Sequence, residues 1–463
     1  MIKKLTYYSF LYTIFSFIVK LISFLCILFL GKVLTPDNYA YFALLFSLHQ
    51  GIASFGAAGI KESIIGHLKK FNKNRDELYS NGIISAIPSF LLITLSSLFI
   101  YEFYLKIKNP NLIFFCFVFT VISGIILSYS SLKSHLYRLN ENHFLSMLYL
   151  FLPQIILFAS GITFFQIFNN PQYFFLGSSI LLFFSIFSFK IFLDKSSWKW
   201  RYGSYTSKIF RESIPYFIIA FAGWLKGYGN NFLINIFLDS YAIASFSFLF
   251  TFSGIILMIA DSVNSVWAPR VYNSYSTASI EKIESSNNLF YGTLAFFIGI
   301  VVSLIILLYP IILELIGGNL VLYSQLRLEL YLILASYILY TPIWHYRIYY
   351  YINSEGKRLM NITILSSVIG IVSMIMFIKY FGSLGIYLGF LSFTIINLLA
   401  ILLLSPRDWK LNINWSGVMA GLIISLISYY LLINQYNVST ILFLVVCLII
   451  STPFLNKIKR LNL

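Results

Sequence analysis

The chain has 463 residues, of which 59% are hydrophobic and only 10% charged, and its mean hydropathy is +0.84. A water-soluble protein of this length cannot bury so much apolar surface, so the composition excludes a soluble globular fold. The formal net charge of +16 would suit a nucleic-acid partner. Membrane proteins, however, gather Lys and Arg in cytoplasmic loops, and we therefore expect no nucleic-acid binding.

Apolar stretches of about 20 residues recur along the whole chain between short polar breaks, and this pattern predicts transmembrane helices. The expected fold is all-α, a polytopic membrane protein with about fourteen transmembrane helices in two pseudo-symmetric six-helix bundles plus a C-terminal helix pair. In chain order, we expect the spans at residues 8–31, 38–60, 80–102, 111–132, 143–166, 172–193, 214–238, 241–268, 287–309, 327–352, 360–379, 384–404, 415–434 and 439–456.

The same pattern divides the chain into two bundles, a basic and aromatic connector between them, and a final pair of spans. A faint internal repeat supports the two halves, because an aspartate precedes a Tyr-Ala pair both at Asp37 and at Asp239. The expected limits are 1–193 for the N-terminal bundle, 194–213 for the cytoplasmic connector, 214–404 for the C-terminal bundle and 405–463 for the two additional spans.

The basic residues predict the orientation of the chain in the membrane. If the N-terminus lies inside, 24 of the 32 Lys and Arg residues fall on the cytoplasmic side, five fall outside, and three lie within spans. Such a bias sets the topology of membrane proteins. We therefore expect both termini in the cytoplasm. The first apolar run lacks a small-residue cleavage site, so we expect it to be retained as a span.

Motifs for catalysis or metal binding are missing from the sequence. It contains no Walker loop, no His/Cys cluster with metal-ligand spacing and no Ser-His-Asp arrangement. The three cysteines, Cys26, Cys116 and Cys447, each stand alone in an apolar run, which favours neither a disulfide framework nor a metal site. We therefore expect no ATP hydrolysis within this chain and no bound cofactor.

Two lysines, Lys20 and Lys226, lie about twelve residues inside the first span of each expected bundle. A charge at bilayer depth costs roughly 3 kcal/mol or more by insertion scales, so it usually faces a polar cavity. The functional interpretation is a cationic lining that binds a phosphate or an acidic sugar, and Asn230, one helical turn beyond Lys226, shares that contact. The structural alternative is a lysine paired with a carboxylate or carbonyl purely for packing. Glycines within 223–229 predict a locally loose helix.

Other polar residues inside the spans leave several interpretations open. Asp261 is the carboxylate deepest in an apolar run, and it either pairs with Lys226, binds a coupling proton or cation, or lies at a wet helix end. His49 is either a proton relay or a hydrogen-bonded helix contact. Arg347 lies near the inner end of its span, where it either contacts substrate or extends toward the interface.

Signals of helix packing are weaker. Gly385 and Gly389 form a GxxxG pattern, which permits close helix contact but occurs frequently by chance. Prolines in or at the ends of the spans remove backbone hydrogen bonds and permit kinks. They are Pro88, Pro153, Pro215, Pro310 and Pro342.

The junction between the first two spans, residues 30–44, reads LGKVLTPDNYAYFAL. This segment resembles the signature of bacterial polysaccharide-export flippases of the O-antigen type, and residues 227–233 resemble the matching segment of that family. The family commonly has an Asp-Arg pair where this chain has Asn230 and Asn231, which leaves Lys226 as the nearby cation. The family belongs to one superfamily with the multidrug and toxic compound extrusion (MATE) transporters and the lipid II flippases.

The resemblance implies a transporter, not an enzyme, that works by alternating access of two bundles in the bacterial inner membrane and is driven by a proton or sodium gradient. The implied substrate is an oligosaccharide linked to undecaprenyl pyrophosphate, such as a repeat unit of O-antigen of lipopolysaccharide, capsule or exopolysaccharide. The implied partners are this substrate, the membrane lipids, a polysaccharide polymerase and a chain-length regulator. On this basis we assign Lys20, Lys226, Asn230 and Arg347 to substrate binding, and Asp261 and His49 to ion coupling.

Two other functions fit part of the sequence. An ion-coupled exporter of small organic cations or drugs would need carboxylates or aromatic rings at the membrane midplane, which a cationic cavity does not supply. A membrane-bound polysaccharide polymerase or acyltransferase usually needs polar catalytic loops outside the membrane, and the outward loops here are short.

Overall fold

The structure is a computed structural model that describes most of the chain. The described residues are 2–57, 59–67, 75–140, 142–192, 205–274, 280–353, 355–406, 409, 411–434 and 439–447. All regular secondary structure within these residues is helical, as the sequence predicts. Ten helical segments in this part of the chain are long and apolar enough to cross a membrane, so the chain is a multi-pass membrane protein.

Contacts between residues divide the chain into two compact units, Met1–Ser247 and Phe248–Leu463. The boundary falls inside α11 (Ser240–Ser274). Most of the expected connector at 194–213 lies outside the described residues. The division into two six-helix bundles at that connector stays a prediction.

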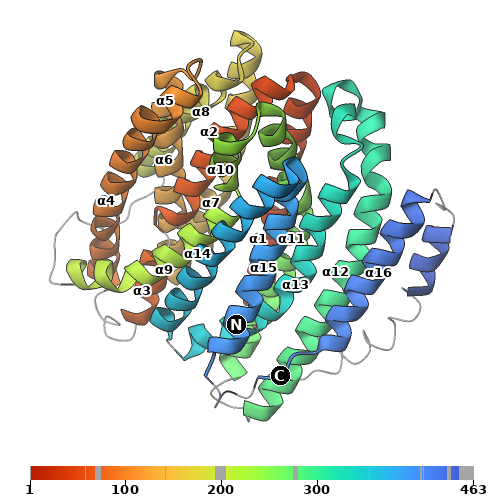
Figure 1. Cartoon of the computed structure of the whole chain (residues 1–463). Coiled ribbons are helices and arrows are strands. Elements are labelled where there is room, and N and C mark those ends of the chain that lie inside the picture. The colour runs from red at the N-terminus through yellow and green to blue at the C-terminus, as the bar shows by residue number, and fades with distance from the viewer. Residues whose placement is uncertain are drawn as a thin grey trace. The chain divides into compact units, whose positions relative to one another are not determined.

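The first unit is organised around α6, which packs against α2, α7 and α8. The helix α9 packs against α2, α3 and α4, and α1 packs against α7. These helices, labelled in Figure 1, are α1 (Ile2–Val33), α2 (Pro36–Phe55), α3 (Ile60–His67), α4 (Arg75–Ile100), the π-helix η1 (Tyr101–Leu105), α5 (Lys106–Lys108), α6 (Phe114–Leu139), α7 (His143–Phe168), the 3₁₀ helix η2 (Pro171–Tyr173), α8 (Phe174–Phe192), α9 (Thr206–Lys226) and α10 (Asn230–Phe237).

The segment that carries the family resemblance forms the start of α2. The Thr35 hydroxyl caps the helix by accepting a hydrogen bond from the Asn38 backbone N–H at 3.5 Å, Pro36 occupies the first helical position, and Asp37 lies in the first turn. Asp239 plays the capping role for α11, because its Oδ1 accepts from the Ala242 N–H at 2.9 Å. Both expected repeats therefore begin a helix, with different capping residues.

The second unit consists of long antiparallel helices. In Figure 1, α12 and α16 run side by side, and so do α14 and α15, in agreement with their contacts. Besides the larger part of α11, its helices are α12 (Ile280–Ile316), the 3₁₀ helix η3 (Gly318–Tyr323), α13 (Arg327–Ile352), α14 (Gly356–Phe381), α15 (Ser383–Leu404) and α16 (Trp415–Ile433). Residues 439–447 are also helical.

The GxxxG pattern at Gly385 and Gly389 lies at the contact between α14 and α15. A Cβ atom on Gly385 would come within 2.1 Å of the Phe377 carbonyl oxygen, and one on Gly389 within 2.8 Å of the Met374 side chain. The two helices are joined at Gly382, whose φ of +58° is a conformation that side chains disfavour. Glycine is therefore needed for both the turn and the close approach.

The predicted spans agree with the helices. Four predicted spans lie outside the ten segments that meet the length and hydropathy criteria, namely 8–31, 214–238, 327–352 and 439–456. Each of the first three coincides with long helical structure, although span 214–238 is broken, and only residues 439–447 of the last are described. The expected count of fourteen is therefore compatible with the structure.

A reporter fused after residue 270 is expected to lie in the cytoplasm, because the bias of basic residues places this end of α11 inside. Green fluorescent protein should fluoresce there, and alkaline phosphatase, which is active only in the periplasm, should stay inactive. A fusion after Lys108, in a loop that we expect outside, should give the opposite result. A periplasmic signal after residue 270 would contradict the orientation.

Candidate functional site

The predicted seventh span is not one continuous helix but two helices separated at Lys226. The helix α9 ends at Lys226, and α10 begins at Asn230. The Gly229 N–H donates to the Trp224 carbonyl at 2.8 Å, so the chain turns tightly between the two helices. A Cβ atom on Gly229 would lie 2.7 Å from the Leu225 Cα, which explains the glycine. The loose segment that the sequence predicts is an interruption of a membrane-spanning segment.

Lys226 is half-buried at the carboxyl end of α9. The negative end of a helix dipole stabilises a cation there, which lowers the cost of a charge within the membrane. Asn230 is buried, and its side-chain amide donates to the Lys226 carbonyl oxygen. The structure thus brings Lys226 and Asn230 together, with the Asn230 amide nitrogen bound to the backbone at the break.

Both sides of this break are held by one residue of α2. The Asn231 side-chain amide donates to the Ser47 hydroxyl at 2.7 Å, and the Trp224 indole N–H donates to the Ser47 carbonyl at 2.8 Å. Ser47 and Asn231 are fully buried. Sequence reasoning missed this arrangement, because Ser47 stands among apolar residues and its partners lie far along the chain.

Substitution of Ser47 by alanine is expected to destabilise the first unit by about 1–3 kcal/mol, because the buried Asn231 amide loses its hydroxyl partner. Thermal unfolding of the purified protein in detergent measures the effect. Ser54→Ala is the matched control on α2, since the Ser54 hydroxyl bonds only to the Gly51 carbonyl of its own helix. Equal stability of the two variants would contradict the role of Ser47.

A second pair of hydrogen bonds connects α10 with the π-helix η1. The Tyr104 hydroxyl donates to the Phe232 carbonyl at 2.8 Å, and the Asn235 amide donates to the Tyr104 oxygen at 2.9 Å. π-Helical turns are rare and occur frequently at functional sites. The short helix that follows Lys226 is therefore anchored at its first and second turns.

Lys20 is half-buried in α1, beside the buried Val19 and the exposed Leu21. The helix α1 packs against α7, where the rings of Phe15 and Phe151 stack with centroids 5.6 Å apart. Lys20 and Lys226 thus belong to one compact unit but lie on helices with different neighbours. A cationic chamber shared by the two lysines stays a prediction.

His49 is a buried contact between α2 and α6. Its Nδ1 lies 2.7 Å from the Ser123 hydroxyl, which itself donates to the Thr120 carbonyl at 2.8 Å. The His49 Nε2 has no hydrogen-bond partner among the described residues. This geometry fits the hydrogen-bonded helix contact, and a role in ion coupling stays a prediction. The backbone of Asp261 is helical within α11, but its side chain lies outside the described residues.

In the second unit, Arg347 is half-buried on α13, with its guanidinium carbon 5.4 Å from the centre of the Tyr340 ring. Nearby in sequence, the Asn287 side-chain amide donates a hydrogen bond to His345 Nδ1 at 2.9 Å, and the Asn287 oxygen accepts from the Trp267 indole at 2.8 Å. Sequence analysis did not find this buried polar network. Within the described residues, no group of His, Cys, Asp and Glu is arranged to hold a metal ion.

Residues 7–275, more than half of the chain, match the model of a family described as "Polysaccharide biosynthesis protein". No curated protein matches the sequence.

Several solved structures share the fold. A multidrug resistance MATE family transporter of the MOP superfamily, in an inward-facing conformation, is similar with a TM-score of 0.66 and 15% identity over 86% of this chain and 99% of that one. A eukaryotic MATE transporter has a TM-score of 0.62 and 13% identity over 89% and 95% of the two chains. A MOP superfamily transporter from Pyrococcus furiosus has a TM-score of 0.55 and 15% identity over 91% and 94%. These likenesses show the fold.

Proposed function

Because the chain belongs to the polysaccharide biosynthesis protein family and has a MATE-like fold, we propose that it is a membrane transporter for lipid-linked oligosaccharides. It moves a repeat unit attached to a polyprenyl pyrophosphate from the cytoplasmic to the outer face of the bacterial inner membrane. The observation that carries this proposal is the interrupted span at Lys226.

Interrupted helices in secondary transporters commonly form the substrate site near the midplane of the membrane. Here the attraction for an anion comes from the Lys226 ammonium group. The first N–H groups of α10 already donate to carbonyls of residues 227–229, so the helix itself offers the anion few open donors. A pyrophosphate carries about two negative charges at neutral pH, and a cation at bilayer depth lowers the cost of its passage.

The remaining assignments complete the proposal. In the first unit, Lys20 supplies a second cation, and Asn230 fixes the backbone that carries Lys226. In the second unit, Arg347 is the residue that we assign to substrate binding. Alternating access is coupled to a proton or sodium gradient, for which Asp261 and His49 are the candidate residues. A polysaccharide polymerase and a chain-length regulator act on the product after it reaches the outer face.

An exporter of small organic cations would share this fold, because fold alone does not determine the substrate. The charge that the substrate site presents distinguishes the two functions. In the Pyrococcus furiosus protein, a reverse polarity of the binding pocket suggests a different function for that MOP superfamily transporter. The lysine at the break and the description of the matching family favour an anionic substrate for this chain.

Reconstitution into liposomes tests the proposal. A fluorescent oligosaccharide on polyprenyl pyrophosphate should become accessible to a membrane-impermeant glycosidase on the opposite face only when protein and an ion gradient are both present. A fluorescent organic cation, tested in the same vesicles, should not be moved. Transport of the organic cation without movement of the lipid-linked sugar would support the exporter and overturn the proposal.

A further inference from the structure

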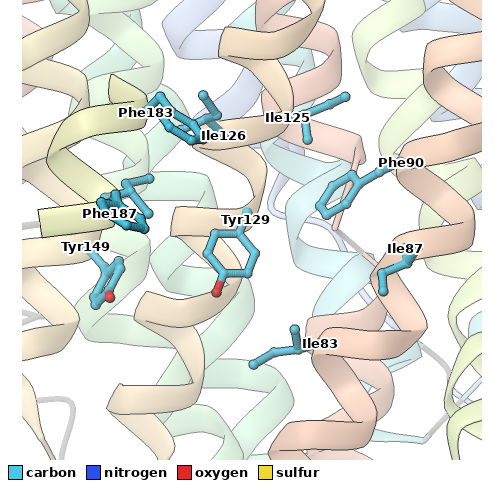
Figure 2. Close-up of a pocket in the computed structure, with 10 residues that line it drawn as sticks. Ile83, Ile87, Phe90, Ile125, Ile126, Tyr129, Tyr149, Phe183 and Phe187 are labelled. Carbon is cyan, nitrogen blue, oxygen red and sulfur yellow. The ribbon is translucent and has the colours of Figure 1, made fainter. Parts of the chain in front are cut away.

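A cavity of about 310 Å³ opens in the first unit between α4, α6, α7 and α8 (Figure 2). Its ten lining residues are all isoleucine, phenylalanine or tyrosine, and none of them takes part in the proposed substrate site. They include Ile83, Phe90, Tyr129, Tyr149, Phe183 and Phe187. The volume is at the lower end of the range for ligand pockets, roughly 300–1,000 Å³.

The cavity is open toward the surface of membrane-spanning helices. Phe183 and Phe187, on α8, are 59% and 54% exposed, and α8 has the length and hydropathy of a membrane span. The surroundings of such a surface are lipid chains. Water gains few hydrogen bonds from walls of isoleucine and phenylalanine, and apolar cavities bind apolar groups instead. A hydrocarbon chain is therefore the fitting occupant.

One end of the cavity is amphipathic. In Figure 2 the hydroxyls of Tyr129 and Tyr149 both point toward the end where Ile83 lies. Beyond this end, α6 carries Lys133, one turn after Tyr129. Lys133 is only 4% exposed, and its Nζ lies 5.8 Å from the centre of the Tyr137 ring, which stacks on Tyr149 at 5.6 Å. A buried cation is thus linked through two aromatic rings to the cavity wall.

Further positive charge lies at the same end of α6. Lys61 on α3 donates to the Ser131 hydroxyl at 2.7 Å. Its positive charge repels that of Arg138, and the negative charge of Glu62 offsets part of the Lys61 charge. Basic pockets between membrane helices on the cytoplasmic side bind the headgroups of anionic lipids.

We propose that this cavity binds one acyl chain of an anionic glycerophospholipid from the cytoplasmic leaflet, with the lipid phosphate at the Lys133 and Arg138 end of α6. The apolar cavity selects the chain, and the cations select the charged headgroup. The site goes beyond the proposed transport function and does not depend on it, because no substrate residue takes part.

Native mass spectrometry of the purified full chain, after exposure to phosphatidylglycerol or phosphatidylcholine with the same acyl chains, tests the site. The wild-type protein should retain phosphatidylglycerol preferentially. Ile126→Trp fills the cavity and should abolish this retention, whereas Ile122→Trp, one turn earlier on α6 and outside the cavity, should not.

Lys133→Gln and Arg138→Gln should each weaken retention about fivefold, the effect of one interfacial cation. Lys106→Gln, in α5 beyond the other end of α4, is the control.

Arg138 is exposed, so its variant keeps the test valid if Lys133→Gln fails to fold. Equal retention of the two phospholipids would overturn the proposal, and so would normal phosphatidylglycerol binding by Ile126→Trp. Retention of a polyprenyl phosphate in place of phosphatidylglycerol would show that the cavity serves the carrier lipid, which would also overturn it.

Discussion

Substitution of Lys226 by alanine is expected to reduce transport of the lipid-linked oligosaccharide at least about tenfold, because a hydrogen bond to a charged group contributes roughly 1.5–3 kcal/mol. The variant removes the cation at the break between α9 and α10 but leaves the glycines and the Ser47 contacts that form the break. Lys226→Arg should keep part of the activity, since the positive charge remains.

The measurements are the liposome assay and the amount of surface polysaccharide in cells, both normalised to the amount of protein in the membrane. Lys208→Ala is the matched control, because Lys208 is an exposed lysine near the start of the same helix. Lys20→Ala should act in the same direction as Lys226→Ala. If both lysine variants transport normally while the protein is present at its usual level, the cationic site does not exist.

Substitution of Gly421 by leucine is expected to destabilise the second unit by about 3 kcal/mol or more, since overpacking against backbone leaves no side chain that can move aside. A Cβ atom on Gly421 would lie 2.5 Å from the Ala295 carbonyl oxygen, and one on Gly299 would lie 2.4 Å from the Gly421 carbonyl. Gly417 meets Gly292 in the same way, with a distance of 2.2 Å to the Gly292 oxygen. The backbones of α12 and α16 are thus in direct contact at two positions along the helices.

Thermal unfolding in detergent and the yield of monodisperse protein measure this effect. Met419→Leu is the control, because Met419 lies on the same helix and is 51% exposed. The control should unfold at the wild-type temperature. A Gly421→Leu variant as stable as Met419→Leu would show that α12 and α16 are not in this close contact.

The membrane helices could be predicted from the sequence because the property that forms each of them, a run of apolar residues, lies within the segment itself. A run of about 20 apolar residues buries itself in a bilayer wherever it occurs, so each predicted span coincides with helical structure in the described residues. Helix starts could be predicted for the same reason, since Thr35, Pro36 and Asp37 act within one turn.

The contacts that hold the candidate site could not be predicted in this way. The glycines within 223–229 predicted a loose helix near Lys226. The hydrogen bond between Ser47 and Asn231 joins residues 184 positions apart, and no local sequence pattern indicates that they meet. The same limit applies to glycine packing. Gly385 and Gly389 were recognised by their spacing, whereas Gly417 and Gly421 have the same spacing and were missed, because a spacing alone does not identify the facing helix.

The double anchoring on Ser47 has a mechanical consequence. Since Trp224 before the gap and Asn231 after it both hold the same point of α2, the two half-helices cannot separate without losing a buried hydrogen bond on one side or the other. If α2 moves during a transport cycle with these two bonds intact, the backbone at Lys226 moves with it, and the position of the charge follows that of α2.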